Sequence, residues 1–464
     1  MKALNPVLIS GKEILPLIEG GKGINVSDGV STGAWANAGG AGTFSAVTCD
    51  CYDENGEWLP EKYYKKTRKE RQDELVEYSI KGGITQAHIA HEMSNGNGRV
   101  HMNILWEIGG CDATLKGILE GTKGILHGIT CGAGMPYKLA EITSSYGVYY
   151  YPIVSSARAF NALWKRAYHK FPEFLGGVVY EDPWCAGGHN GLSNSENPRE
   201  PQPPYSRVVA LRKAMIDVGL KDTPIIVAGG VWWLEEWEDW LDNPEIGKVV
   251  FQFGTRPLLT QESPITDNWK QKLLDLKKGD VLLQKFSPTG FYSSAVKTRF
   301  LNNLERRKQA EIEYSLEASD TKNTSVTTRS NNTVYVSEAE AAQIKSYETD
   351  GLTVVRRTPD NTLVFLTKDE DDRFKKEISE CIGCLSACNY SAWSERDNGS
   401  TGKIPDPRSF CIHKTLIDIS HGGDVEDNIM FAGHNAYRFG LDPFYNDGFI
   451  PTVAELIERI KTGK

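Results

Sequence analysis

Two adjacent glycines and a histidine form the first segment of this chain whose residue types could carry out chemistry. Gly187, Gly188 and His189 follow shortly after an apolar run, residues 177–179, that predicts a buried strand. Glycine lets a backbone come close to a planar ligand or a phosphate because it has no Cβ. Histidine can exchange a proton near neutral pH. The segment therefore predicts a reaction site at the end of a strand, and an ordinary glycine loop is the alternative.

Four of the nine cysteines lie in one C-terminal segment and could bind a metal. Cys381, Cys384 and Cys388 are separated by two and three residues, and Cys411 follows. Thiolates bind soft metals, and four of them can hold zinc or an iron–sulfur cluster. Unliganded reduced cysteines are a third interpretation. His413 could replace Cys411 as the fourth ligand.

Two further glycine turns could bind a phosphate. One predicted strand ends in Gly229 and Gly230, and the next ends in Gly254 and Thr255. Backbone N–H groups in such turns can point at an anion. In eight-stranded α/β barrels a phosphate often lies between the loops after strands seven and eight. Tight turns without a ligand are the alternative interpretation.

The elements that must position these residues follow an alternating pattern. Short apolar runs, typical of parallel strands covered on both faces, alternate with helical spacing such as that of residues 156–168 and 205–218. Eight strands with crossover helices in about 250 residues predict a (β/α)8 TIM barrel, with a doubly wound open sheet as the alternative. The predicted strands are residues 14–18, 43–48, 100–105, 124–129, 148–154, 177–180, 224–228 and 249–253.

The pattern predicts a barrel followed by a smaller C-terminal α+β module. Residues 1–300 should form the barrel, with an insertion over residues 50–99 between strands two and three. Residues 301–380 predict a helix, a linker and a small hairpin. Residues 381–464 predict a cysteine-rich segment that packs on the barrel and ends in a helix.

Three loops could reach the mouth of the site. Residues 190–206 are rich in Pro and Asn and predict an ordered surface loop, which could act as a lid. Residues 285–290 are a candidate substrate loop. Residues 431–438 form a polar and aromatic turn, for which packing of the tail on the barrel is the more ordinary role.

The composition excludes several classes of function. The chain of 464 residues carries 52 Lys and Arg against 61 Asp and Glu, a net charge of -9. This balance argues against non-specific nucleic-acid binding, which depends on neutralising phosphates. No stretch approaches the roughly 20 apolar residues of a membrane span, and the N-terminus lacks the apolar core of a signal peptide. We therefore expect a cytoplasmic protein with reduced or metal-bound cysteines.

The order of the glycine motifs resembles that of the nitronate monooxygenase (2-nitropropane dioxygenase-like) family, which includes FMN-dependent enoyl-acyl-carrier-protein reductases. The resemblance covers about residues 10–300 and implies a barrel that holds FMN at its C-terminal face. The family's first turn often has Gln before Gly-Gly and Met after it, where this chain has Glu19 and Lys22. A buried Glu19 beside a flavin would need a partner, and Lys22 is the candidate. The matching segments are residues 19–23, 38–42, 103, 132–136, 154–157, 186–189, 229–230 and 254–255.

The resemblance also implies roles for individual residues. Asn103 would contact the isoalloxazine or ribityl region of FMN, and His189 would face the flavin and the substrate as the residue that transfers a proton. The phosphate would be bound by Gly188, Gly229, Gly230, Gly254 and Thr255. Further cofactor contacts would come from Gly20, Gly21, Gly132, Gly134, Ala186 and Gly187.

The expected function is FMN-dependent oxidation of a nitronate or nitroalkane with O2. An NAD(P)H-dependent enoyl or quinone reductase on the same scaffold is the alternative, and a flavin- or metal-binding redox sensor is a third. The first three clustered cysteines resemble the cluster segment of old-yellow-enzyme-type dienoyl-CoA reductases, although the gap before Cys411 is longer. This implies a [4Fe–4S] cluster rather than zinc, which would favour a reductase. NAD(P)H or an electron-transfer protein would then supply electrons, and the chain could form a homo-oligomer.

Overall fold

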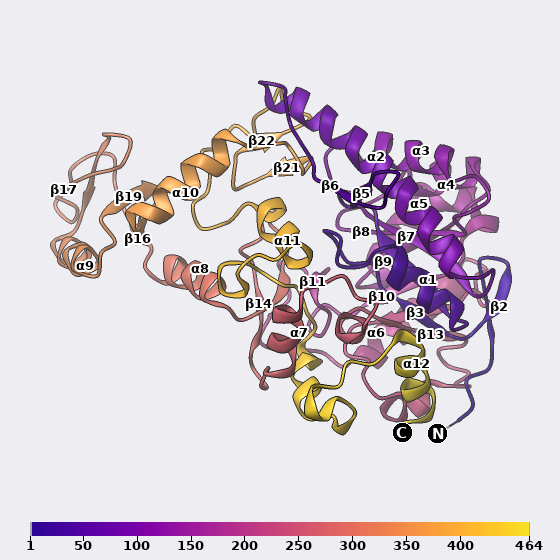
Figure 1. The fold of residues 1–464 in the computed structure, drawn as a ribbon. Coiled ribbons are helices and arrows are strands. Elements are labelled where there is room, and N and C mark those ends of the chain that lie inside the picture. Colours follow the sequence, from indigo (N-terminus) through magenta and orange to yellow (C-terminus); the bar gives the residue numbers. More distant parts are fainter. Residues whose placement is uncertain (1, 464) are drawn as a thin grey trace.

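The computed structural model describes residues 2–463 and contains a closed barrel of eight parallel strands. Each barrel strand pairs with the next one along the chain, and the eighth pairs with the first. The predicted (β/α)8 barrel is therefore confirmed (Figure 1). The strands are β3 (Leu17–Glu19), β4 (Ala41–Ser45), β7 (Arg99–Leu105), β8 (Gly128–Gly132), β9 (Tyr149–Val154), β10 (Val178–Glu181), β12 (Ile225–Ala228) and β13 (Val249–Phe253).

Two barrel strands begin later than their apolar runs indicate. Ile14 belongs to a separate hairpin, β1 (Val7–Ile9) with β2 (Lys12–Ile14), whose isoleucines pack against the residues inside the barrel. The fourth strand begins at Gly128 instead of residue 124. Gly124 has a φ of 81° in the turn after the preceding helix, a backbone conformation that a strand does not contain.

Helices cover the outside of the barrel, and a 3-10 helix, η3 (Leu234–Trp240), takes the place of the seventh. The second crossover is the long helix α2, which packs against α1 and α3. Most of the predicted insertion is therefore this barrel helix, and only residues 46–67, with β5 (Cys51–Tyr52) and β6 (Trp58–Leu59), are additional. The helices are α1 (Gly29–Asn37), α2 (Arg68–Met93), α3 (Cys111–Gly121), α4 (Leu139–Ser145), α5 (Ala157–Arg166) and α6 (Pro204–Ile216), with the short 3-10 helices η1 (Tyr168–Lys170) and η2 (Pro172–Phe174) before β10.

The eighth barrel helix comes from the C-terminal end of the chain. Helix α12 (Val453–Thr462) packs against α1, and its residues Val453, Leu456 and Ile460 are buried in the barrel core. Figure 1 shows both ends of the chain at the same end of the barrel. The predicted cysteine-rich segment thus ends inside the barrel architecture.

A second hydrophobic core lies over the carboxyl ends of the barrel strands. It joins Ile24 and Val26 of the first barrel loop to Trp269, Leu416 and other residues that follow the barrel. A three-stranded sheet belongs to this layer, in the order β11 (Gly188–His189), β15 (Ser293–Val296) and β14 (Val281–Gln284). The other elements of the layer are η4 (Arg256–Leu259), α7 (Asp267–Leu274), β21 (Ala387–Cys388), β22 (Trp393–Ser394), α11 (Ile412–His421), η5 (Val425–Asp427), η6 (His434–Gly440) and η7 (Pro443–Gly448).

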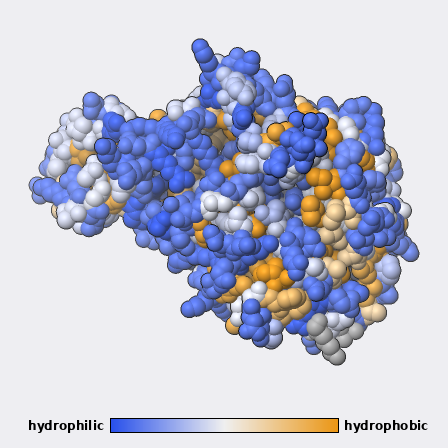
Figure 2. Space-filling model, viewed as in Figure 1, coloured by the Kyte–Doolittle hydropathy of each residue, from blue (hydrophilic) through white to orange (hydrophobic). Residues whose placement is uncertain are grey.

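A small module projects from the barrel between helices α8 (Arg299–Gln309) and α10 (Lys368–Ser379). It has a core of its own, which includes Val334, Leu363 and Phe365. Its predicted hairpin is present as β19 and β20, whereas part of the predicted linker forms strand β17. The module stands to the left in Figure 1, and its surface is mainly hydrophilic in Figure 2. The elements are α8 (Arg299–Gln309), β16 (Ile312–Glu313), β17 (Thr324–Thr327), β18 (Thr333–Val336), α9 (Glu338–Thr349), β19 (Val354–Arg357), β20 (Thr362–Leu366) and α10 (Lys368–Ser379).

The described helices, those of residues 2–463, include none with the length and apolar character that crossing a membrane requires.

Arg212 on α6 fastens the loops that lead into two barrel strands. Its side chain is buried and donates hydrogen bonds to the carbonyl oxygens of Thr223 at 2.8 Å, Ile246 at 2.6 Å and Lys248 at 3.1 Å. Thr223 lies just before β12, and Lys248 lies just before β13. The guanidinium therefore satisfies backbone acceptors that the barrel buries at this end.

We expect Arg212→Met to lower the free energy of unfolding by about 3 kcal/mol or more, because several buried carbonyl oxygens would lose their donors. Urea unfolding followed by circular dichroism measures this loss. The matched control is Arg158→Met on the exposed face of α5, which should change stability by less than about 0.5 kcal/mol. Equal effects of the two substitutions would contradict the role given to Arg212.

Candidate active site

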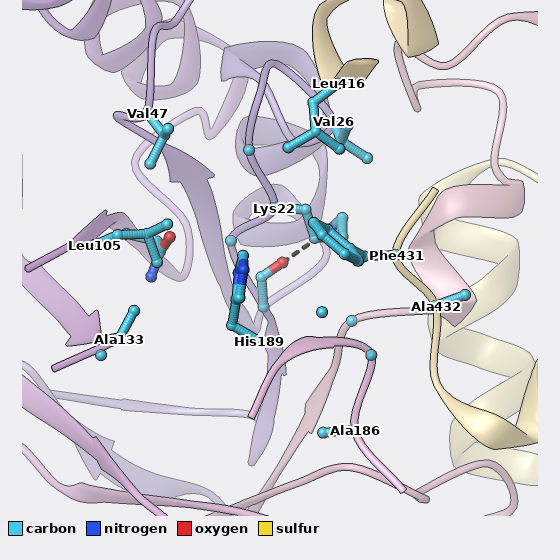
Figure 3. Close-up of a pocket in the computed structure, with 18 of the residues that line it drawn as sticks. Lys22, Val26, Val47, Leu105, Ala133, Ala186, His189, Leu416, Phe431 and Ala432 are labelled. Atoms are coloured by element: carbon cyan, nitrogen blue, oxygen red, sulfur yellow. Dashed lines mark hydrogen bonds between the residues drawn. The ribbon is translucent and has the colours of Figure 1, made fainter. Parts of the chain in front are cut away.

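One cavity at the carboxyl ends of the barrel strands brings the sequence-predicted site residues together (Figure 3). Gly134 does not line it; a Cβ at that position would lie 2.6 Å from the Glu107 carboxylate, and Ala133 faces the cavity instead. The predicted residues that line the cavity are Gly20, Gly21, Asn103, Gly132, Ala186, Gly187, Gly188, His189, Gly229, Gly230, Gly254 and Thr255.

His189 is held in this cavity by a short hydrogen-bonded chain. Its Nε2 lies 2.6 Å from Ser287 Oγ, which lies 2.8 Å from Thr289 Oγ1. The ring also lies beside Phe431, with 5.2 Å between the ring centroids (Figure 3). Burial lowers the pKa of His189 to about 4, so the imidazole is neutral at neutral pH and can accept a proton.

The two glycines before His189 have different structural reasons, of which the first is a contact with the C-terminal tail that includes residues 431–438. A Cβ on Gly187 would lie 2.5 Å from the carbonyl carbon of Ala432 and 2.6 Å from the nitrogen of Gly433. Gly188 has a φ of 72°, which favours glycine. The sequence predicts that a ligand comes close to the backbone here. At Gly187, the backbone of the C-terminal tail makes such a close contact.

The two later glycine turns form a cradle that fits an anion. Gly229 and Gly230 have φ values of 92° and 83°, which side chains rarely adopt. A Cβ on Gly254 would meet no atom within 4 Å, so this turn leaves open space. The tail also fastens both turns: Asn435 Nδ2 donates to the Gly230 carbonyl oxygen at 2.6 Å, and Thr255 Oγ1 accepts from the tail backbone at 2.8 Å.

Asn103 and the first glycine turn form the opposite wall. Asn103 is buried near the end of β7, and its Nδ2 donates to the Thr130 carbonyl oxygen at 3.3 Å. A Cβ on Gly21 would lie 2.3 Å from the Cβ of Asn103. Glycine at this position therefore allows the first turn to lie against the asparagine.

Glu19 and Lys22 form a buried ion pair beneath this turn. The Glu19 side chain is 1% exposed, and Lys22 Nζ lies 3.0 Å from its Oε1. Lys22 also donates to the Gly20 carbonyl oxygen at 2.8 Å (Figure 3). Burial raises the pKa of Glu19, and Lys22 opposes that shift. Lys22 is thus the partner that the sequence suggests for this carboxyl group.

Glu181 is a further titratable residue of the cavity that the sequence did not single out as functional. It is the last residue of β10 and lines the cavity. Burial, together with the neighbouring Asp182 charge, raises its pKa to about 8. The carboxyl group therefore keeps its proton at neutral pH. Its position at the carboxyl end of a predicted barrel strand could have indicated a functional role, because active sites of such barrels lie at that end.

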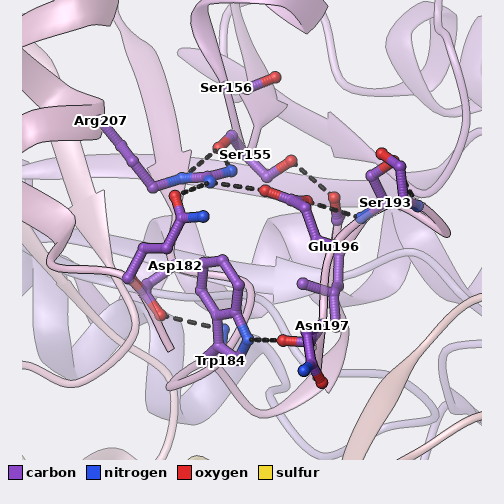
Figure 4. A network of polar contacts seen from close by, with 12 residues as sticks. Ser155, Ser156, Asp182, Trp184, Ser193, Glu196, Asn197 and Arg207 are labelled. Atoms are coloured by element: carbon purple, nitrogen blue, oxygen red, sulfur yellow. Dashed lines mark hydrogen bonds and ion pairs between the residues drawn. The ribbon is translucent and has the colours of Figure 1, made fainter. Parts of the chain in front are cut away.

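The loop predicted as a lid is fastened to the barrel end by polar contacts (Figure 4). Glu196 accepts from Arg207 at 2.7 Å, and both side chains are largely buried. Asp182 Oδ1 accepts from the backbone nitrogen of Trp184 at 3.0 Å, and the Trp184 indole donates to the Asn197 carbonyl oxygen at 3.1 Å. These contacts hold the loop in an ordered position next to the sixth strand.

Residues of the tail complete the cavity from far along the chain. Phe431, Ala432, Gly433 and Asn435 all line it. An antiparallel bridge between Ala295 and Phe431 places this segment beside the sheet that carries His189. The polar and aromatic pattern marks the segment as a candidate, but only these contacts place it in the site.

The four clustered cysteines line a second cavity that adjoins the first. Cys384, Leu385, Ile412 and His413 border both cavities. Within residues 2–463, no group of three or more His, Cys, Asp or Glu side chains is arranged to hold a metal ion, so a preformed single-ion site is not present there. His413, the alternative fourth ligand, forms a hydrogen bond with Glu61 instead.

The family comparison matches the central part of the chain. The sequence profile described as "Nitronate monooxygenase" matches residues 122–349, which include barrel strands four to eight, the segment with His189 and both glycine turns of the cradle. A search of curated proteins finds no match.

Three solved structures are similar to this chain at low sequence identity. The enoyl reductase domain of MlnA from Bacillus amyloliquefaciens is 12% identical, with a TM-score of 0.54 over 96% of this chain and 93% of that chain. FabK from Thermotoga maritima is 15% identical, with a TM-score of 0.48 over 96% and 91% of the two chains. The nitroalkane oxidase from Streptomyces ansochromogenes is 17% identical, with a TM-score of 0.46 over 64% and 79%.

The profile match covers the strands and turns that carry His189 and the anion cradle, and the barrel supplies the expected scaffold. Over residues 122–349 the chain is therefore similar to the nitronate monooxygenase family, as expected for an FMN-dependent oxidoreductase.

Proposed function

We propose that FMN binds in the first cavity and that the enzyme oxidises a nitronate or nitroalkane, with O2 as the electron acceptor and His189 as the proton acceptor. The observation that carries this proposal is the position of His189. Its neutral imidazole lines the same cavity as the anion cradle. FMN, when bound, supplies the electron-accepting chemistry.

The phosphate of FMN fits the cradle formed by Gly229, Gly230 and Gly254. Backbone groups in these turns can point at an anion, and the missing Cβ of Gly254 leaves room for it. The remaining residues expected to contact the cofactor, Asn103 and the first glycine turn among them, lie on the opposite wall. This arrangement lets the cofactor span the cavity between the two walls.

His189 can take a proton from the carbon next to a nitro group. A pKa of about 4 leaves the imidazole free to accept a proton at neutral pH. The hydrogen bond between His189 Nε2 and Ser287 Oγ fixes the ring orientation, and Thr289 in turn positions Ser287. When Nε2–H donates this bond, Nδ1 is left to accept the proton. Phe431 packs beside the ring, and the tail lines the same cavity.

An NAD(P)H-dependent reductase of an enoyl or quinone substrate is the second candidate, and Glu181 favours it. A reductase must deliver a proton to the reduced substrate, and the carboxyl group of Glu181 holds one at neutral pH. His189 and Glu181 thus offer an acceptor and a donor in one cavity. The two proposals differ in which of these groups controls the rate.

We expect Gly254→Asp to raise the Kd for FMN by about 100-fold or more, because its carboxylate would enter the open space of the cradle and repel a phosphate. Fluorescence titration of the flavin-free protein with FMN measures the change. The matched control is Gly254→Asn, which has nearly the same size without the charge. An unchanged Kd for the Asp variant would contradict the assignment, and equal losses in both variants would show that the effect is steric.

We expect His189→Asn to retain FMN and to slow anaerobic flavin reduction by a nitroalkane by about 100-fold or more, since the proton acceptor is lost. Stopped-flow absorbance measures the rate. Ser287→Ala should slow it less, because it removes only the bond that orients the ring. The wild-type rate should stay constant from about pH 6 to pH 8 and fall as the pH approaches about 4, where His189 becomes protonated.

The same assay with NAD(P)H separates the two candidates. Rapid flavin reduction by NAD(P)H, none by nitronates or nitroalkanes, and substrate reduction that declines above about pH 8, where Glu181 ionises, would favour the reductase. A rate with nitroalkane that His189→Asn leaves unchanged would overturn the proposed role of His189.

A further inference from the structure

We infer that Cys381, Cys384, Cys388 and Cys411 bind an iron–sulfur cluster in the second cavity. All four side chains line this one cavity, although they lie on separate parts of the chain. Cys381 and Cys384 follow α10, Cys388 belongs to β21, and Cys411 precedes α11. The other five cysteines of the chain do not line it.

The backbone around the cysteines is fixed by contacts from the barrel. Arg71 Nη2 on α2 donates to the Cys381 carbonyl oxygen at 2.8 Å, and Gln72 Nε2 donates to that of Gly383 at 3.0 Å. The Gly109 nitrogen donates to the Cys384 carbonyl oxygen at 3.0 Å. A site whose ligand-bearing backbone is held from outside is suited to bind a metal group with little rearrangement.

Gly383 is constrained for a related reason. It has a φ of 67°, and a Cβ there would lie 3.2 Å from the indole of Trp393. The same indole donates to the Leu385 carbonyl oxygen at 3.0 Å. The turn between Cys381 and Cys384 is thus shaped and packed so that both side chains face the cavity.

The arrangement fits a cluster better than a single zinc ion. Four thiolates around zinc lie about 2.3 Å from one point, and therefore about 3.8 Å from each other. Among the described residues, no three such side chains converge on a point in this way. The four cysteines instead line one cavity together with other residues, and a multi-atom cluster held by four cysteine thiolates would occupy it.

The second cavity shares a wall with the proposed FMN site. Cys384 and Leu385 border both cavities, so a cluster there would lie next to the flavin. Only the placement of the cluster next to a flavin rests on the proposed function. The binding of the cluster itself depends on the cysteines alone.

The test is the metal content of the full-length protein, purified without oxygen and incubated with ferrous iron and sulfide. We expect about four iron and four sulfide per chain, together with broad absorption that persists after FMN is removed. Cys381→Ala and Cys411→Ala should lose the iron and sulfide and keep the circular dichroism spectrum and the FMN. The matched control, Cys111→Ala, removes a buried thiol outside the cavity and should retain the cluster.

Three outcomes would overturn the inference. One zinc per chain with no iron and sulfide would indicate a single-ion site, and no bound metal would indicate unliganded thiols. Equal loss of iron in Cys111→Ala and Cys381→Ala would show that the bound iron does not depend on this cavity. A chain that binds the cluster but not FMN would refute the proposed function and leave this inference intact.

Discussion

The contact between Gly187 and the returning tail is the constraint on which the site depends. Gly187 has no Cβ, so the backbone of Ala432 and Gly433 can lie directly against it. The tail is fixed from its other side as well, because the Ala432 nitrogen donates to the Ser294 carbonyl oxygen at 3.3 Å. The tail thereby links the loop after the sixth strand to the sheet that carries His189 and to both turns of the anion cradle.

This constraint explains why so much of the chain follows the barrel. The carboxyl ends of parallel strands would otherwise leave a wide, wet opening, in which a carboxyl group would ionise and a histidine would have its ordinary pKa. The second hydrophobic core covers this opening and changes the local electrostatics. Burial raises the pKa of Glu181 and lowers that of His189, so a protonated carboxyl group and an unprotonated imidazole lie in one cavity at neutral pH.

Sequence reasoning was strongest where the signal is local. The buried strand runs predicted the barrel, and the glycine turns and His189 were placed at the strand ends that form the cavity. It was weaker where a segment's role depends on a distant partner. Gly187 packs against the tail as well as lining the cavity, and a Cβ on Gly134 would meet the Glu107 carboxylate. The long helix α2 was predicted to be part of an insertion, because its charged sequence does not indicate a barrel crossover helix.

The sequence by itself determined the barrel, the positions of its turns and the grouping of four cysteines, because apolar periodicity, glycine and short spacing act within a few residues. Only the tertiary structure decided that α12 completes the barrel, that Phe431 and Asn435 line the first cavity, and that the four cysteines line a second cavity beside it. These features depend on packing between segments that are far apart in the chain. A short stretch of sequence does not indicate which distant segment will pack against it.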